Sequence, residues 1–272
     1  MLRYTHRLPS IPGAGGWEMP LRFRLPPRSA YPLNFITPKS SHNDLLSVLP
    51  PAEMERLRPH LVRVGLVNGQ ILHEAGERID QVIFVGRGYV SMVAEADGDD
   101  KGTEVGLIGR ESMVGLPVLL DPGAASFNQA MVQSPGEAVR LPAQVLHDNA
   151  GHLPVLRRGL SQAMEVLMAQ VAQTAACNSQ HNLVQRLARW LLMAHDRVDG
   201  DELTATQEFL SIMLAVRRSG VTIASQALVA TGAIRAGRGR MTVCDRPALE
   251  AAACGCYGRV RTFTDAVAAR NT

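Results

Sequence analysis

The residues best suited to chemistry in this sequence are arginines. Five of them lie between Phe209 and Cys244, a stretch that contains no acidic residue: Arg217, Arg218, Arg235, Arg238 and Arg240. A guanidinium group offers paired hydrogen-bond donors to phosphate oxygens and to the edge of guanine. An acid-free basic stretch is therefore the pattern expected of a polyanion-binding surface. The alternative interpretation is a set of ordinary solvated arginines.

The segments around these arginines predict how they are held. Thr206 suits the N-cap of a helix that ends near Leu214, and a second helix follows the arginine pair. Ser211 and Ala215 are small where the two helices are expected to cross. A short helix, a tight turn and a second helix with polar and basic residues at its start are typical of a helix-turn-helix. Gly220 lowers the helix propensity of the second segment by about 1 kcal/mol relative to alanine.

A wing is predicted after the second helix, because two short strands surround a glycine-rich tip in "GAIRAGRGRMTV". The first residues of a recognition helix enter the major groove, and basic residues on a wing can contact backbone phosphates. The residues predicted to contact DNA are Arg217, Arg218, Ser219, Thr222, Gln226, Arg235, Arg238 and Arg240.

The first half of the chain has a different sequence pattern. Short β-rich runs separated by turn residues fill the stretch between Val62 and Leu141, and a short helical piece that begins near Leu45 precedes them. This spacing favours an antiparallel sandwich or barrel.

A helix with heptad spacing is predicted between the two halves. Four apolar residues and a threonine recur at steps of four and three positions: Leu160, Met164, Leu167, Val171 and Thr174. Such a seam is a natural dimer contact, although two heptads are also compatible with ordinary core packing. An amphipathic helix with Leu187 and Trp190 on its apolar face follows.

The four cysteines fall late and irregularly, at Cys177, Cys244, Cys254 and Cys256. They form no disulfide framework, which favours a reducing cytoplasm. Cys177 and His181 share one helix face, so a symmetric dimer could present two of each to one zinc ion. We favour the alternative of a buried cysteine beside a polar histidine. The spacing of Cys254 and Cys256 is only weak evidence for a redox-responsive or metal-binding pair. We therefore expect no metal site and no cofactor.

Composition and motifs exclude several classes of protein. The chain has 272 residues, a formal net charge of +3 and 46% hydrophobic residues. It contains no run of eighteen apolar residues, no secretory signal, no P-loop and no nucleophile-elbow motif, so we expect neither a membrane protein nor an enzyme. Residues 1–40 hold seven prolines and six basic residues. We interpret them as a disordered basic arm, or as translation begun upstream of a start at Met19.

Three stretches together resemble the Crp/Fnr family of transcription regulators: "GQILHEAGERIDQVIFVGRGYVSMV", "EVGLIGRESMVGLPVLL" and the helix-turn-helix. The resemblance covers about residues 45 to 250. It implies an α+β fold with an antiparallel β-roll sensor domain, a long dimerisation helix and a C-terminal winged helix-turn-helix. The expected boundaries are 1–40 for the arm, 41–150 for the sensor, 151–180 for the dimerisation helix, 181–260 for the winged domain and 261–272 for a tail.

The second stretch resembles the phosphate-binding cassette of this family. Candidate effector-pocket residues are Gly109, Gly115, Leu116, Phe127 and Asn128. Leu116 stands where cyclic-nucleotide binders of the family carry an acid, and Phe127 and Asn128 stand where they carry an arginine and a serine. An anionic phosphate would lack electrostatic compensation there, so we expect that cAMP is not the ligand. The cassette can also be plain core packing.

Further departures limit what the resemblance implies. No cysteine precedes Cys177, which disfavours the iron–sulfur branch of the family. Ser219 replaces an acid of the best-known recognition helices and Ile223 replaces an arginine, so the operator sequence cannot be carried over.

The sequence thus predicts a cytoplasmic, homodimeric, sequence-specific DNA-binding regulator that binds a palindromic duplex and contacts RNA polymerase. One alternative is a ligand-binding or protein-docking module without specific DNA readout. Another is a regulator with a cysteine redox switch. The effector, the operator and the choice between activation and repression stay open.

Overall fold

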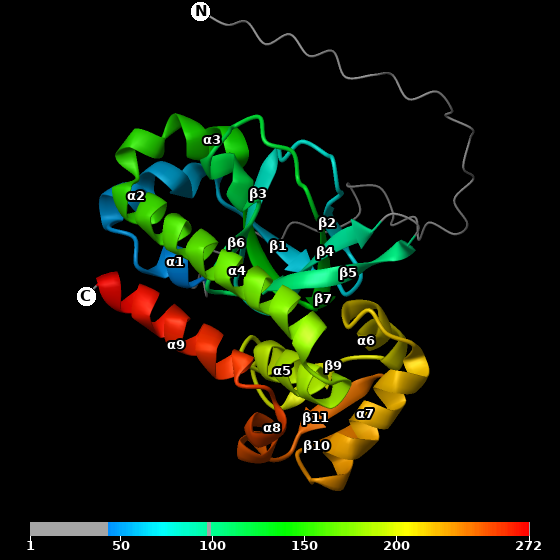
Figure 1. The fold of residues 1–272 in the computed structure, drawn as a ribbon. Helices are drawn as coiled ribbons and strands as arrows, with labels where there is room; N and C mark the ends of the chain where they lie inside the picture. Colours follow the sequence, from blue (N-terminus) through cyan, green and yellow to red (C-terminus); the bar gives the residue numbers. More distant parts are fainter. Residues whose placement is uncertain (1–42, 97–98, 272) are drawn as a thin grey trace, which may run out of the picture. The chain divides into compact units, whose positions relative to one another are not determined.

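The computed structural model describes residues 43–96 and 99–271 (Figure 1). The predicted arm, residues 1–40, lies outside this part of the chain. The α-helices are α1 Asp44–Ser47, α2 Pro51–Leu57, α3 Ala143–Asp148, α4 Pro154–Gln180, α5 Leu183–His195, α6 Gln207–Met213, α7 Arg218–Ala230, α8 Arg246–Ala252 and α9 Cys256–Ala268. Within the described ranges, no helix is both long enough and apolar enough to cross a membrane.

The strands form three antiparallel sheets. Their bounds are β1 Val62–Leu66, β2 Ile71–His73, β3 Gln81–Val85, β4 Tyr89–Ala96, β5 Asp99–Ile108, β6 Met113–Val114, β7 Gln129–Ser134, β8 Gly136–Pro142, β9 Glu202–Thr204, β10 Ile234–Gly237 and β11 Arg240–Val243. Two four-stranded sheets, ordered β1-β8-β3-β6 and β2-β7-β4-β5, make the predicted sensor fold. The third sheet, ordered β10-β11-β9, is three-stranded.

Helix α4 begins against α2, where a carboxylate compensates for missing backbone partners. The Glu53 carboxylate accepts hydrogen bonds from the backbone N–H groups of Val155 at 2.9 Å and Leu156 at 3.0 Å. The first N–H groups of a helix have no intrahelical acceptor, so this contact satisfies two of them. Leu156 and Leu160 then pack into the sensor core with residues of α1 and α2 such as Leu46 and Leu57.

The heptad seam of α4, which is predicted to form a dimer interface, faces this core within the single chain. Leu160 is 0% exposed within a single chain, and Met164 and Leu167 pack against the same core. Leu167 and Val171 also lie against Gly106 of β5. Thr174 hydrogen-bonds to the Gln170 carbonyl at 2.8 Å and to the Arg189 guanidinium at 3.2 Å. An apolar stripe is the same whether it meets a partner or the chain's own sheet, so the spacing alone could not distinguish them.

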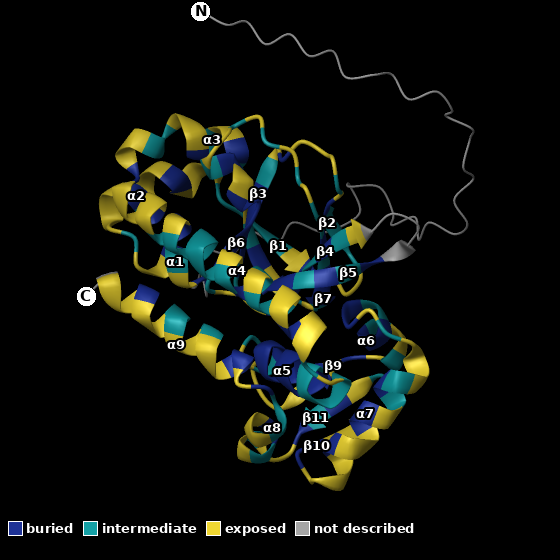
Figure 2. Ribbon diagram, in the orientation of Figure 1, coloured by how far each residue is buried: buried dark blue, intermediate teal, exposed yellow. Residues whose placement is uncertain are grey.

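The winged domain is built around α5, which is dark blue along most of its length in Figure 2 because eight of its residues are buried. The core of this domain also includes Tyr89 and Leu107, from β4 and β5 of the sensor. The two halves of the chain therefore share one hydrophobic core.

The last helix, α9, includes most of the segment that is expected to be a tail, residues 261–272. It spans Cys256–Ala268 and packs along α4 (Figure 1). The Gln162 side chain donates to the Val267 carbonyl at 3.3 Å, and Arg270 pairs with Glu165 at 2.9 Å. Val267 is buried, so α9 contributes to the packing of the chain.

Candidate nucleic-acid interface

The helix-turn-helix forms as the caps predict. Thr206 is the N-cap of α6, and its hydroxyl accepts a hydrogen bond from the Phe209 backbone N–H at 3.0 Å. Leu214 is the C-cap. Ala215 follows with a φ of 50°, and the Val216 N–H returns to the Ser211 carbonyl at 2.9 Å. Ala215 is thus an exposed turn residue in the left-handed region, and its expected place at the helix crossing was wrong.

Helix α7 is seated on α5 and α6 by its buried face, which includes Val221, Ala224 and Leu228. Gly220 lies where a Cβ atom would come within 3.1 Å of the Leu183 side chain of α5. Its low helix propensity is therefore offset by the close approach of the two helices that it permits.

The opposite face of α7 is open to solvent. Arg217 is the N-cap, and Arg217, Arg218, Ser219, Ile223 and Gln226 are all exposed. Thr222 differs, because it is half-buried and its hydroxyl donates to the Gln207 side chain of α6 at 2.9 Å. Thr222 thus joins the two helices of the motif, a role that the sequence did not indicate.

The wing is the β10–β11 hairpin, in which Arg235 pairs with Thr242 and Gly237 with Arg240. Arg235, Arg238 and Arg240 are exposed. The Arg240 guanidinium lies 3.1 Å from the Glu202 carboxylate of β9. Among the described residues, no carboxylate forms an ion pair with the other four arginines of the interface: Arg217, Arg218, Arg235 and Arg238.

The candidate effector residues have different surroundings. Gly115 adopts a φ of 99°, and a Cβ there would meet Ile79, Val82 and His73, while Leu116 is buried in the sensor core. A Cβ on Gly109 would meet Glu111 and Arg197.

The second pair of candidate effector residues lies elsewhere. The Phe127 side chain is 87% exposed, and the half-buried Asn128 accepts a hydrogen bond from Ser126 through its backbone carbonyl.

A buried carboxyl group links the sensor sheet to the winged domain. Glu104 of β5 accepts hydrogen bonds from the Ser91 hydroxyl of β4 and, at 2.8 Å, from the Trp190 indole of α5. Burial raises the pKa of Glu104 to about 7, although both hydrogen bonds and the charges of Arg197 and Arg189 oppose this effect. Tyr89 and Phe209 both pack edge-to-face with Trp190.

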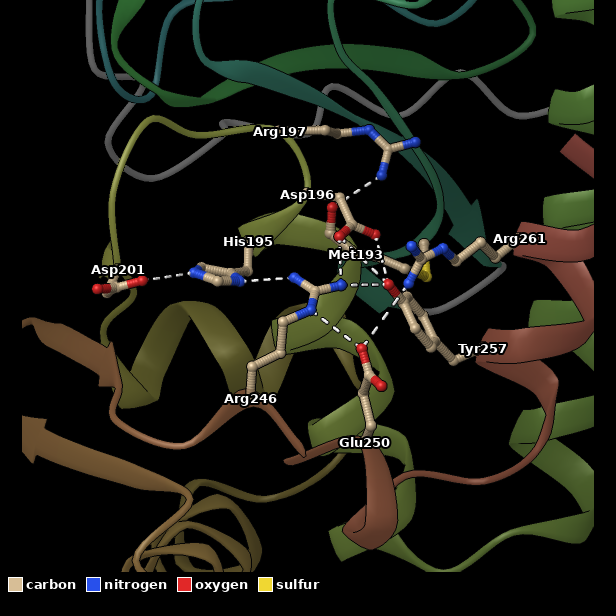
Figure 3. A network of polar contacts seen from close by, with 9 residues as sticks. All are labelled: Met193, His195, Asp196, Arg197, Asp201, Arg246, Glu250, Tyr257 and Arg261. Atoms are coloured by element: carbon tan, nitrogen blue, oxygen red, sulfur yellow. Dashed lines mark hydrogen bonds and ion pairs between the residues drawn. The ribbon is translucent and has the colours of Figure 1, made fainter. Parts of the chain in front are cut away.

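Arg246 is the centre of a polar network between α5, α8 and α9 (Figure 3). Its guanidinium donates to Asp196 at 2.6 Å, to Glu250 at 3.0 Å and to the His195 Nδ1 at 2.7 Å. The Tyr257 hydroxyl donates to Asp196 at 2.9 Å. Since arginine only donates, the neutral His195 carries its proton on Nε2 and donates it to Asp201 at 3.0 Å. Burial and the Asp196 charge raise the pKa of Tyr257 to about 12.

The structure also brings together two sequence features that were expected to be independent. Cys177 of α4 and His181, the C-cap of that helix, meet Cys254 and Cys256 at the start of α9 within one chain. Burial raises the pKa of the Cys177 thiol to about 12. The expectation of no metal site treated these two pairs separately.

Comparison with known proteins agrees with this arrangement. Residues 185–252 match the family model of the Crp-like helix-turn-helix domain. No curated protein matches the chain.

Several solved structures share the fold. A protein assigned to the Crp/Fnr family from Eubacterium rectale is 17% identical, with a TM-score of 0.58 over 78% of this chain and 98% of its own. FixK2 from Bradyrhizobium japonicum is 14% identical, with a TM-score of 0.59 over 71% and 98%. The c-di-GMP-responsive global regulator CLP from Xanthomonas campestris is 17% identical, with a TM-score of 0.56 over 72% and 100%.

The match at residues 185–252 agrees with the helix-turn-helix seen in the structure, and the chain shares the overall fold of these solved structures. The chain therefore contains a Crp-like helix-turn-helix domain.

Proposed function

We propose that the chain is a homodimeric, sequence-specific DNA-binding regulator that reads the major groove with α7. The observation that carries this proposal is the exposed start of α7 beside the wing, with four arginines that no described carboxylate neutralises. Arg217, Arg218, Ser219 and Gln226 supply donors toward bases and phosphates, while Arg235 and Arg238 of the wing supply phosphate contacts. Arg240 is a weaker candidate for a DNA contact, because Glu202 already neutralises its charge.

The dimer follows from the geometry of operator reading, because a symmetric pair of recognition helices binds two half-sites about one helical turn apart. The sensor and α9 pack against α4 but leave one face of this helix open. This open face supports the proposal that a second copy of the chain binds there. Met168 is 66% exposed, and the small residues Ala172 and Ala175 follow it at steps of four and three on the same face. We place the dimer contact on this face, because Leu160 is enclosed in the core.

The sensor acts on the winged domain through the core that the two share. Glu104 and Tyr89 of the sensor contact Trp190 of α5, and α5 carries α7. A ligand that alters β4 or β5 can thereby alter the orientation of the recognition helix. The buried Leu116 and the exposed Phe127 support an effector other than cAMP. A cytoplasmic location and contact with RNA polymerase belong to the same proposal.

The test is selection of bound sequences from a random duplex library at near-physiological salt. A two-fold symmetric motif is the expected result. Recovery of no motif, with weak binding that salt abolishes, would favour a protein-docking or effector-dependent role instead. Arg218→Ala is expected to change the selected bases, and an unchanged motif with unchanged affinity would remove Arg218 from the interface.

A further inference from the structure

Four potential metal ligands converge where the end of α4 meets the connection between α8 and α9. Cys177 and His181 are four residues apart, and His181 is the C-cap of α4. Cys254 and Cys256 flank Gly255, the N-cap of α9, so the turn directs two sulfur atoms to one side. Their donor atoms all lie within 4.8 Å of one another. Cys177, Cys254 and Cys256 are 1%, 4% and 8% exposed.

Two donor–donor distances in this cluster match the edges of a zinc tetrahedron. The Cys177 and Cys254 sulfur atoms are 3.5 Å apart, and the Cys256 sulfur lies 3.7 Å from the His181 Nδ1. Bonds of about 2.3 Å to sulfur and about 2.0 Å to nitrogen place tetrahedral donors about 3.5–3.8 Å apart. A disulfide requires sulfur atoms about 2.05 Å apart. The arrangement therefore fits a shared ion better than a covalent pair.

The surroundings also suit a thiolate site. The Gln173 side chain donates a hydrogen bond to the Cys256 sulfur at 3.0 Å, a contact typical of the groups that support metal ligands. Arg189 is buried and its charge acts on Cys177, yet it forms no ion pair among the described residues. The Nε groups of Arg186 and Arg189 have no hydrogen-bond partner in the described part of the chain. Three thiolates around one divalent ion carry a net charge of −1, which a buried guanidinium balances.

We propose that Cys177, His181, Cys254 and Cys256 bind one structural zinc ion. Four protein ligands close the coordination sphere, which is the arrangement of a structural and not a catalytic site. Binding releases the three thiol protons to solvent and leaves three thiolates and a neutral imidazole on the metal. The ion would tie the end of the sensor's long helix to α8 and α9, and would hold α9 along α4.

The first experiment measures the metal content of the full-length chain, purified without chelators. About one zinc per chain is expected for the wild type. Cys254→Ser and Cys256→Ser should lower it severalfold. Cys244→Ser is the matched control, because Cys244 is exposed and outside the cluster, and it should keep its zinc. A wild type that stays free of zinc after incubation with zinc under reducing conditions would overturn the proposal.

A second measurement does not depend on whether the variants fold. Cobalt added to wild-type protein from which zinc has been removed should give the intense visible bands of tetrahedral thiolate coordination, and added zinc should abolish them. The weak spectrum of hexa-aqua cobalt would contradict the site. Thiol titration of the denatured, unreduced chain should find all four cysteines free. A Cys177–Cys254 disulfide without zinc would overturn the proposal in favour of a redox pair.

Discussion

The indole N–H of Trp190 donates a 2.8 Å hydrogen bond to the buried carboxyl group of Glu104. This bond joins β5 of the sensor sheet to α5, the helix against which the recognition helix packs. Because it crosses the core shared by the two halves of the chain, its strength should affect the stability of the fold.

Glu104 should give the protein a pH-dependent stability. Its pKa is about 7 in the folded chain and lower in the unfolded chain, so the folded state binds more protons over the interval between them. The contribution of this group to stability is full below its ordinary pKa and is lost as the pH rises through about 7. Urea unfolding measures the free energy of unfolding at about pH 5 and about pH 8. Its decrease between these two pH values should be smaller for Glu104→Gln than for the wild type. Equal decreases for Glu104→Gln and the wild type would contradict this prediction. The control is Glu55→Gln, at an exposed position on α2, which should behave as the wild type does.

Arg246 should matter for stability more than a surface arginine does. Replacing it with alanine leaves Asp196 and Glu250 without their main partner and frees the Nδ1 of His195, so we expect a loss of about 1–3 kcal/mol. Arg78→Ala is the matched control, since Arg78 and Asp80 form a largely exposed pair whose loss should cost at most about 1 kcal/mol. Chemical denaturation measures both values. Similar losses would mean that the network adds little beyond its individual pairs.

Arg218 and Arg238 should affect DNA binding differently. Arg218→Ala removes a donor at the start of α7, so it should relax the preference for particular bases and cost about 1–3 kcal/mol of binding free energy. Arg238→Ala removes a phosphate contact of the wing, so it should weaken all duplexes alike and lower the salt slope by about one. Fluorescence anisotropy on specific and scrambled duplexes at several salt concentrations separates the two effects. Arg56→Ala, at an exposed position on α2, should change neither.

Ala215 should tolerate glycine but not valine. Its φ of 50° costs an L-residue about 1–2 kcal/mol, and a β-branched side chain is still less compatible with this region. Ala215→Gly should change stability by less than about 1 kcal/mol, because the relieved strain offsets the entropy gained by the unfolded chain. Ala215→Val should lower the melting temperature clearly. Ala230→Val, in the helical backbone of α7, provides the comparison, and equal shifts for the two valine variants would contradict the strain argument.

Met168 tests the dimer face. Met168→Glu places a charge on the open face of α4 and should shift the chain from dimer to monomer in sedimentation equilibrium, with a parallel loss of affinity for two-half-site duplexes. Arg158→Glu, at another exposed position of the same helix, should leave the dimer intact. A dimer that persists in Met168→Glu would move the contact to a different surface.

Local signals predicted much of this fold. Helix α6 begins after Thr206 and ends before Leu214, as expected, because an N-cap hydrogen bond involves only neighbouring residues. The glycine-rich tip and the short strands beside it predicted the wing. The β-rich runs separated by turn residues predicted the antiparallel sheets. Each of these features depends on a few consecutive residues, so the sequence alone carries the information.

The remaining features depend on which surfaces meet. The spacing of Leu160 and its neighbours determined that α4 is amphipathic, but only packing decided that this stripe faces the chain's own sheet. Cys177 and Cys254 are 77 residues apart, so no local pattern links them. The sequence determined the elements through short-range hydrogen bonding and periodicity. The tertiary structure decided their partners, because burial and contact between distant segments arise only when the whole chain has folded.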